Sequence, residues 1–261
     1  MRVSLIITTY NWPESLILVL KSIENQTIVP EEVVIADDGS TVETKEIIVK
    51  FQKDSDLNII HSWQEDNGFR AAKSRNKAIA KSCGDYIILI DGDIILHPKF
   101  IQDHVNNAKV GYFIQGSRVL ITQDITEQII ISKKISFSFL SKGLNSKKNS
   151  IHSNFLSKIF STYKNSLRGT RCCNIAFFKQ DCINVNGFNN EFEGWGREDS
   201  EFVLRLFNNG LYRKIVRFNA IQYHLWHKEI DRTSLDCNNQ LLQNSIKNKL
   251  KVCKKGINKY I

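Results

Sequence analysis

The sequence has no long hydrophobic run, and no apolar stretch approaches the ~18–20 residues that a membrane-spanning helix needs. The first ten residues hold one basic residue, Arg2, and then a short apolar stretch with no small-residue cleavage site after it. Such a stretch is too short for the core of a secretory signal. We therefore interpret it as a first β-strand and expect a cytoplasmic protein.

Motifs that define several common classes are also missing. The six cysteines form no Cys-x-x-Cys pair, which argues against a zinc or redox site and favours reduced, mostly buried thiols. Neither Gly-x-Gly-x-x-Gly nor a Walker A sequence occurs, so dinucleotide-binding and P-loop interpretations lose their usual support. The 261 residues, 42% of them hydrophobic, suffice for one large domain or two tightly joined ones with a sizeable core.

Acidic residues are absent from one long segment. The net charge is +9, yet residues 1–127 carry −5 and residues 181–261 carry +4, whereas residues 128–180 hold ten Lys and Arg and no acid. We call residues 128–180 the basic segment. Charge confined to one segment indicates a local docking surface, so we expect no nucleic acid partner. Its interleaved lysines and aromatics suit an anionic membrane surface, which predicts a peripheral position on the inner face of the cytoplasmic membrane. An acidic glycan or a lipid-diphosphate acceptor would suit them equally.

Strand and helix patterns alternate along the first hundred residues. Predicted strands span residues 3–9, 32–36, 58–63 and 86–90, and predicted helices span residues 14–25, 41–51 and 69–81. This alternation predicts an α/β fold with a mostly parallel sheet flanked by helices. Further strands are expected at 111–121, 171–178 and 214–226, and helices at 198–208 and from residue 238 onward.

Acidic clusters follow two of these strands. They are Asp37-Asp38-Gly39-Ser40 and Asp91-Gly92-Asp93. Carboxylates two residues apart can hold a divalent cation and the ribose or phosphates beside it, although Asp and Gly also form ordinary turns and caps. Ligands of parallel sheets bind at the carboxyl ends of the strands, so we expect the two clusters to converge.

Residues 66–76 enter the third predicted helix. Their backbone N–H groups and Arg75 suit a diphosphate or a nucleobase edge, whereas the simpler alternative is a turn followed by a basic helix face.

The stretch Gly194-Trp195-Gly196-Arg197-Glu198-Asp199 is the most unusual in the chain. A tryptophan between two glycines offers a flat apolar face for a sugar ring. Acids in the first turn of a helix complement the helix dipole, and a general base also fits that place. We favour the functional interpretation, because the dipole does not explain the tryptophan between glycines.

Two histidines, His224 and His227, end a later strand-like run. Together with the candidate carboxylate metal site they suggest metal ligands. Residues three apart in a straight strand face opposite sides, so we expect one firm ligand rather than two.

The ordered set of motifs resembles the family 2 glycosyltransferases. It runs through Thr8-Thr9-Tyr10-Asn11, Ala36-Asp37-Asp38-Gly39-Ser40, Asn67-Gly68-Phe69 with Ser74-Arg75-Asn76, and Asp91-Gly92-Asp93. Asn186-Gly187-Phe188 and the later Gly194 to Glu201 stretch resemble the galactosyltransferase-type module shared by β-1,4-galactosyltransferases and bacterial chondroitin-type polymerases. The resemblance covers roughly residues 3–110 and 169–228.

This resemblance implies a GT-A fold, Rossmann-like, with a smaller acceptor-side subdomain. It implies the following roles by position. The nucleotide would meet Thr8, Tyr10, Asp37 or Asp38, Asn67, Arg75, Asp91 and Gly92. The metal, Mn²⁺ or Mg²⁺, would bind Asp93, His227 and, with less support, His224. Asp199 matches the catalytic base with Glu198 beside the acceptor, and Trp195, Gly196 and Arg197 match the loop that contacts donor and acceptor.

The expected function is inverting transfer of a hexose or N-acetylhexosamine from a UDP-sugar to a saccharide or lipid-linked saccharide in bacterial surface polysaccharide synthesis. We divide the chain into a nucleotide-sugar-binding half (1–127), a basic variable insertion (128–168), a catalytic and acceptor module (169–230) and a basic tail (231–261).

Two other classes compete with this interpretation. A sugar nucleotidyltransferase would need a glycine-rich, arginine-containing loop after the first strand, where this chain has Thr9-Tyr10-Asn11-Trp12-Pro13. A non-enzymatic basic protein that binds glycan or nucleic acid would explain the basic segment but not Glu198, Asp199 and the histidines.

Overall fold

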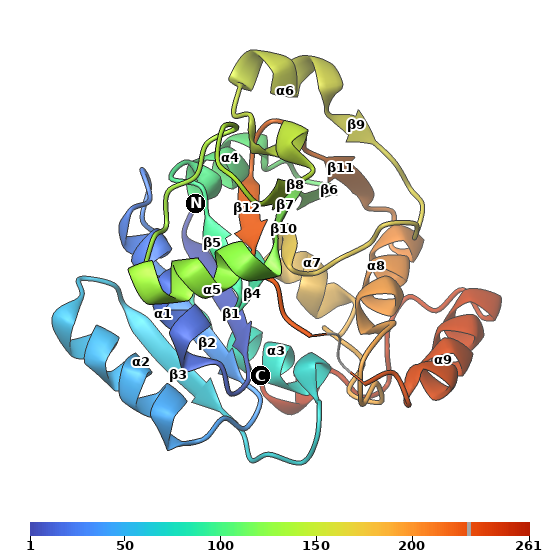
Figure 1. Ribbon diagram of the computed structural model, residues 1–261. Coiled ribbons are helices and arrows are strands. Elements are labelled where there is room, and N and C mark those ends of the chain that lie inside the picture. The colour runs from blue at the N-terminus through green and yellow to red at the C-terminus, as the bar shows by residue number, and fades with distance from the viewer. Residues whose placement is uncertain (229–230) are drawn as a thin grey trace.

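Two sheets organise the fold in the computed structural model, which describes residues 1–228 and 231–261 (Figure 1). The main sheet has the strand order β3-β2-β1-β4-β10-β6-β11-β9, and the second has the order β5-β12-β7-β8. The strands of the main sheet are β1 (Val3–Thr9), β2 (Glu32–Asp37), β3 (Ile59–Trp63), β4 (Tyr86–Asp91), β6 (Tyr112–Gln115), β9 (Thr162–Tyr163), β10 (Asn174–Phe178) and β11 (Tyr212–Ile215). Those of the second are β5 (Ile94–Leu96), β7 (Ser117–Ile121), β8 (Leu144–Asn145) and β12 (Ile221–His224).

The predicted α/β class with a largely parallel sheet is confirmed. β1 lies parallel to both β2 and β4, and β2 lies parallel to β3. β10 is antiparallel to β4 and β6, so the sheet is mixed. The register sets Thr9 opposite Asp37 and Thr8 opposite Asp91, which brings both acidic clusters to one edge of the sheet, as expected.

Helices cover both faces of the main sheet. They are α1 (Pro13–Glu24), α2 (Val42–Asp54), α3 (Ala71–Lys81), α4 (Phe100–Asn107), α5 (Gln123–Ser132), α6 (Asn154–Phe160), α7 (Lys179–Asn184), α8 (Glu198–Asn208) and α9 (Leu235–Lys247), with short 3₁₀ turns η1 (Lys147–Ser150) and η2 (Ile257–Lys259). Leu16 of α1 and Phe100 of α4 join the core on one face, and Ile79 of α3 and Phe202 of α8 join the core on the other. Each such buried side chain contributes roughly 1.5–3 kcal/mol, which fixes the helices against the strands.

Two predicted strands are wrong in the same way. Residues 111–121 form β6 and β7, and residues 214–226 contain the end of β11 and all of β12, so each run is divided between the two sheets. The first run breaks at Gly116, where a Cβ would lie 2.5 Å from Oδ1 of Asn174. The second turns through Phe218 and Ala220, both at positive φ, and the Asp103 carboxylate accepts the N–H of Ala220. The alternation of apolar and polar residues continues through both breaks, so the sequence pattern does not reveal where the strands end.

Much of the basic segment is folded. β8 pairs with β7 in the second sheet, β9 pairs with β11 at the edge of the main sheet, and α6 projects from the top of the molecule (Figure 1). The division of the chain into four segments remains a prediction, and strands from both sides of the basic segment share the main sheet.

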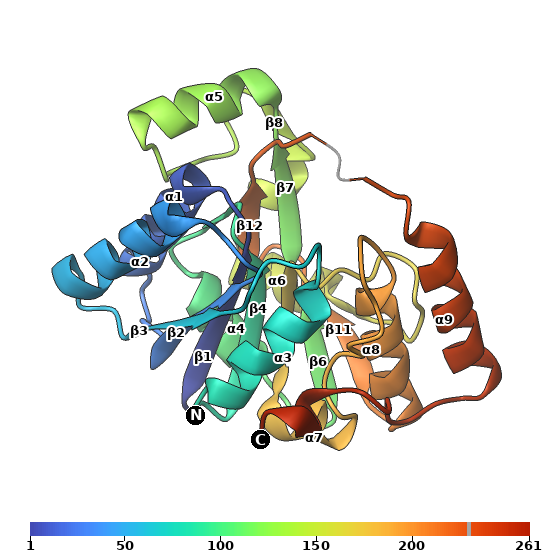
Figure 2. The same ribbon diagram turned by 90° about the horizontal axis from the view of Figure 1, so that it is seen from below.

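The C-terminal residues form the expected helix, which begins at Leu235 rather than Asn238 and lies beside α8 (Figure 2). Among the described residues, no helix has both the length and the apolar character to cross a membrane.

Candidate active site

Four carboxylates gather at the carboxyl edge of β1 and β4. Asp91 and Asp93 come from the end of β4 and the turn after it, and Glu198 and Asp199 come from the first turn of α8. We call these four side chains the acidic region. Glu198 and Asp199 are more than a hundred residues from Asp91 in sequence, so the acidic region exists only because the fold brings the first turn of α8 to the end of β4.

Arg75 of α3 connects the two halves of the acidic region. Its Nη1 donates to Oδ1 of Asp199 at 3.1 Å and to Oε1 of Glu198 at 3.3 Å, and its Nη2 pairs with Oδ1 of Asp91 at 3.4 Å. Its Nε donates to Oγ1 of Thr8 at 3.1 Å. Burial alone would lower the pKa of Arg75, but the charges of Asp199, Asp91 and Glu198 outweigh burial and raise it, so Arg75 stays charged.

The two acids of α8 differ in their surroundings. Glu198 has a side chain that is 12% exposed, and burial followed by the charge of Asp199 raises its pKa to about 7. Asp199 accepts the backbone N–H of Cys172 on Oδ2 at 2.7 Å, in addition to Arg75 on Oδ1. Two donors hold the Asp199 carboxylate in one orientation.

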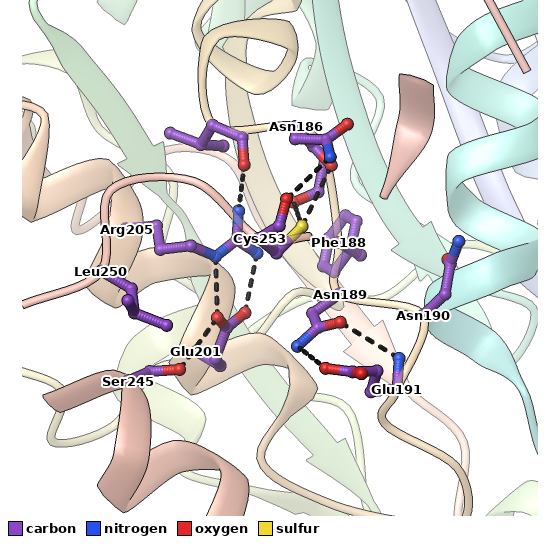
Figure 3. A network of polar contacts seen from close by, with 12 residues as sticks. Asn186, Phe188, Asn189, Asn190, Glu191, Glu201, Arg205, Ser245, Leu250 and Cys253 are labelled. Carbon is purple, nitrogen blue, oxygen red and sulfur yellow. Dashed lines mark hydrogen bonds and ion pairs between the residues drawn. The ribbon is translucent and has the colours of Figure 1, made fainter. Parts of the chain in front are cut away.

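A buried polar network further along α8 holds this helix in place (Figure 3). Glu201 and Arg205, one turn apart and both fully buried, form a bidentate pair at 2.8 and 2.7 Å. Ser245 of α9 donates to Glu201 at 3.2 Å, and Asn186 donates to the carbonyl of Cys253 at 2.8 Å. The C-terminal residues are therefore part of the scaffold that positions Glu198 and Asp199.

The structure brings together three of the predicted metal ligands. Ligand atoms of Asp93, His224 and His227 all lie within 4.8 Å of one another. Oδ2 of Asp93 is 3.5 Å from Nε2 of His224 and 3.3 Å from Nε2 of His227. Because β12 ends at His224, the chain can turn before His227, and the objection from straight-strand geometry does not apply. Both histidines reach Asp93, and their roles as ligands remain predictions.

The expected nucleotide contacts lie around the ends of β1 and β2. Asp37 is fully buried and is engaged by the N–H of Ser40 and by His61, both at 2.8 Å. Asp38 accepts the backbone N–H of Arg70 at 2.6 Å, and burial raises its pKa. Asp37 therefore shapes the turn, and Asp38 lies closer to the loop at residues 66–70.

Three other predicted nucleotide residues take different places. Tyr10 is half exposed and donates its hydroxyl to Asp66 at 2.9 Å. Asn67 follows Asp66 in the same exposed loop. Gly92 has a backbone role, since its carbonyl accepts the hydroxyl of Ser15 at 2.7 Å and a Cβ there would lie 2.9 Å from Oγ1 of Thr9.

The loop before α8 presents Trp195 at the surface. Gly194, Gly196 and Arg197 all have positive φ, and the N–H of Gly194 donates to the carbonyl of Phe69 at 2.8 Å. Nε of Arg197 donates to Oδ1 of Asn239 in α9 at 2.6 Å. The loop thus bridges the residue 66–70 loop and the C-terminal helix.

Sequence reasoning missed three residues at this site. The Arg75 guanidinium carbon lies 5.4 Å from the centroid of the Phe188 ring, Cys172 contributes its backbone N–H, and Asp66 holds Tyr10. Phe188 lies within a stretch that the resemblance had selected, and Asp66 lies at the start of the residue 66–76 stretch. A backbone donor such as that of Cys172 leaves no signal in the sequence.

The arrangement of the sheets and helices matches solved structures of Staphylococcus aureus TarS. The structure of TarS residues 1–349 in complex with UDP aligns with a TM-score of 0.64 at 18% identity, over 95% of this chain and 66% of that chain. The structure in complex with UDP-GlcNAc gives the same TM-score at 17% identity, over 95% of this chain and 67% of that chain. The fold is therefore of the GT-A type, as the resemblance implied.

Family comparisons agree with the fold. The model of glycosyl transferase family 2 matches residues 4–170, and the model described as the N-terminal domain of galactosyltransferase matches residues 155–228. The chain belongs to glycosyl transferase family 2. The first match runs through most of the basic segment, for which the sequence resemblance had found no counterpart.

Several curated relatives are much longer than this chain. It is 29% identical to a chondroitin synthase of Escherichia coli, over 85% of this chain and 34% of the relative. It is 30% identical to a hyaluronan synthase of Pasteurella multocida, over 85% of this chain and 24% of the relative. The chain thus spans about a third or less of their length.

Proposed function

We propose that the chain is a metal-dependent, inverting glycosyltransferase that moves a hexose or N-acetylhexosamine from a UDP-sugar to a saccharide or lipid-linked saccharide in bacterial surface polysaccharide synthesis. One observation carries this proposal: Arg75 joins Asp91 at the end of β4 to Glu198 and Asp199 of α8, directly beside the Asp93, His224 and His227 cluster. The relatives named as chondroitin and hyaluronan synthases support the substrate class, and the TarS complexes support UDP.

The donor nucleotide would lie along the ends of β1 and β2. Tyr10 offers an exposed ring, and Asp38 and Asn67 offer polar atoms close to it. Arg75 and Thr8 would meet the nucleotide beyond them, with Asp91 at the ribose or in the shell of the metal. With these contacts, the nucleotide would extend from the residue 66–70 loop, and its diphosphate would lie near Asp93.

The residues around Asp93 fit a divalent cation. Oδ1 of Asp93 is buried and has no hydrogen-bond partner among the described residues, while Oδ2 faces both imidazoles. One carboxylate and two imidazoles suit Mn²⁺, and the acidic region holds four carboxylates, three of which share Arg75. Asp93, His227 and His224 would hold the ion, which when bound acts as a Lewis acid that neutralises the leaving diphosphate.

Asp199 would take the proton of the acceptor hydroxyl as that oxygen attacks C1 of the donor sugar. The new bond joins C1 to the acceptor oxygen, the bond from C1 to the diphosphate breaks, and UDP leaves with the electron pair. Attack from the opposite side inverts an α-linked donor to a β-linked product. Glu198 would contact the acceptor, and Trp195 would cover the donor sugar.

Two other classes of function predict different chemistry. A sugar nucleotidyltransferase would require a triphosphate-binding loop after β1, and the Thr9 to Pro13 stretch lacks the glycines for one. A non-enzymatic binding protein would show no turnover. Membership of glycosyl transferase family 2 favours glycosyl transfer over both.

The basic segment suggests where the protein works. Phe155 and Ile159 of α6 are exposed on either side of Lys158. Exposed apolar side chains beside a lysine suit a peripheral position on the anionic inner face of the cytoplasmic membrane.

The decisive experiment for the function is a donor screen. UDP release is measured with UDP-Gal, UDP-GalNAc, UDP-Glc and UDP-GlcNAc, with Mn²⁺ and with EDTA. We expect release from at least one donor only when the metal is present. Binding of UDP-sugars without turnover for any of them would favour the non-enzymatic alternative.

A further inference from the structure

Two further arginines, Arg118 and Arg171, border the candidate active site beside Cys172 and His224. Arg118 lies in β7, where the parallel register sets it beside Gln222 of β12. Residues paired in neighbouring strands share one face of the sheet, and so do residues two apart in one strand. Arg118 is therefore on the same face as Gln222 and His224. Nε2 of Gln222 lies 3.4 Å from Sγ of Cys173, so this face looks toward residues 171–173.

Arg171 approaches the same place from the other side. It precedes Cys172, whose backbone N–H binds the Asp199 carboxylate at 2.7 Å. Arg171 is two residues from Cys173, the residue that Gln222 contacts, so Arg118 and Arg171 approach the same place. Burial and then the positive charge of Arg118 lower the pKa of Arg171. We call Arg118 and Arg171 the basic pair.

The basic pair lacks an ion-pair partner in the part of the chain that the structure describes. Within residues 1–228 and 231–261, no carboxylate forms an ion pair with either guanidinium, although both side chains are partly buried. Arg75 and Arg205, by contrast, each bind at least one carboxylate.

A third arginine adds positive charge next to the basic pair. Arg213 is fully buried, and its guanidinium donates to carbonyl, amide and hydroxyl oxygens of Gln115, Lys164, Ser166, Arg168 and Thr170. These acceptors hold the turn that leads to Arg171 but carry no negative charge. Burial and the charge of Arg171 lower the pKa of Arg213.

We propose that the basic pair is a subsite for an anionic group of the acceptor, a carboxylate or a phosphate, placed next to the catalytic carboxylates. Like charges packed together without a partner are unfavourable, and an anion between them removes that cost. The planar guanidinium fork matches carboxylate and phosphate oxygens.

The acceptor, rather than the donor, is the ligand because Arg171 adjoins the Cys172 contact to Asp199, the group that receives the acceptor proton. In the proposed function the donor diphosphate lies between Arg75 and Asp93, and the UDP arm of the test below separates the two ligands. This inference rests on the proposed function and names its acceptor as an acidic one.

Binding of matched oligosaccharides tests the subsite without requiring turnover. The full chain, loaded with UDP and Mn²⁺, is titrated calorimetrically with an oligosaccharide of alternating glucuronic acid and N-acetylhexosamine. It is titrated separately with the same oligosaccharide after its carboxyl groups have been reduced to alcohols. A glycerol phosphate oligomer forms a third arm, and the arm that binds identifies the source of the anion.

Arg118→Gln and Arg171→Gln are each expected to weaken binding of the charged ligand about tenfold, the effect of losing one hydrogen bond to a charged group. Binding of the reduced oligosaccharide and of UDP should not change. Arg168→Gln is the matched control, since its side chain is exposed in the same segment.

Three results would overturn the subsite. The first is failure of the wild-type protein to bind either anionic ligand. The second is an equal loss of affinity for the charged and the reduced oligosaccharides in the variants. The third is weaker UDP binding in the variants, which would place the pair at the donor. The donor screen for UDP release is read separately, so an inactive protein and a missing subsite give different patterns.

Discussion

The acidic region and the basic pair adjoin each other in one candidate active site and carry opposite charges. The acidic region has four carboxylates, three of which pair with Arg75, whereas neither arginine of the basic pair forms an ion pair with a described carboxylate. In neither cluster do the described residues neutralise the net charge. Each side is therefore suited to a ligand of the opposite charge: a divalent cation beside Asp93, and an anionic acceptor beside Arg171.

Removing Arg75 should disturb the acidic region most. Arg75→Met leaves three carboxylates without their shared cation, and we expect loss of transfer together with about 2–3 kcal/mol lower stability in urea unfolding. This loss of stability is smaller than the ~3–5 kcal/mol that breaking a fully buried ion pair costs, because Asp91 and Asp199 are partly exposed.

Arg75→Lys is the matched control for this loss. It keeps the charge without the planar fork and should lie between the wild type and Arg75→Met in stability. Mn²⁺ should restore part of the stability of Arg75→Met, because a cation at Asp93 offsets the same negative charge. Wild-type stability in Arg75→Met would show that the acidic region is not electrostatically strained.

The raised pKa of Glu198 predicts a smaller, pH-dependent effect. Its pKa is about 7 in the folded chain, against 4.5 for an ordinary glutamate, so the folded state binds the proton more tightly. The proton therefore stabilises the fold at low pH, and this contribution is lost as the pH rises from about 4.5 through about 7.

Thermal unfolding of the metal-free protein from pH 5 to pH 8 checks this effect. The Tm of the wild type should fall with pH more steeply than that of Glu198→Gln, by about 2–4 °C for each kcal/mol of difference. Parallel Tm curves for the two proteins would contradict the shifted pKa.

Charges on the surface of the basic segment should matter least to the site. Reversing Lys133, Lys134, Lys147 and Lys148 to glutamate should weaken co-sedimentation with anionic vesicles, at ~1 kcal/mol for each basic residue near the surface. UDP binding should not change, which would separate the surface charge from the basic pair. Unchanged co-sedimentation would remove the proposed membrane contact.

Local sequence patterns predicted much of the fold. β1 spans Val3–Thr9 as its β-branched run predicts, and the clusters at Asp37 and Asp91 follow their strands as expected. The breaks at Gly116 and before β12 were not predictable, because each depends on packing against distant residues such as Asn174 and Asp103.

The candidate site shows the same limit. The sequence indicated Asp93, His227 and Asp199 individually, but not that Arg75 would pair with acids 123 and 124 residues away. Arg118 gave no signal, and Arg171 counted only as one of the ten basic residues of the basic segment, because the pairing of the two arginines depends on the folded sheet.

UDP release by Asp199→Asn tests the central claim most directly. The variant keeps the size of the side chain and removes the base, so transfer from the active donor should be abolished while UDP still binds with Mn²⁺ at wild-type affinity. Full transfer activity in Asp199→Asn would contradict the account.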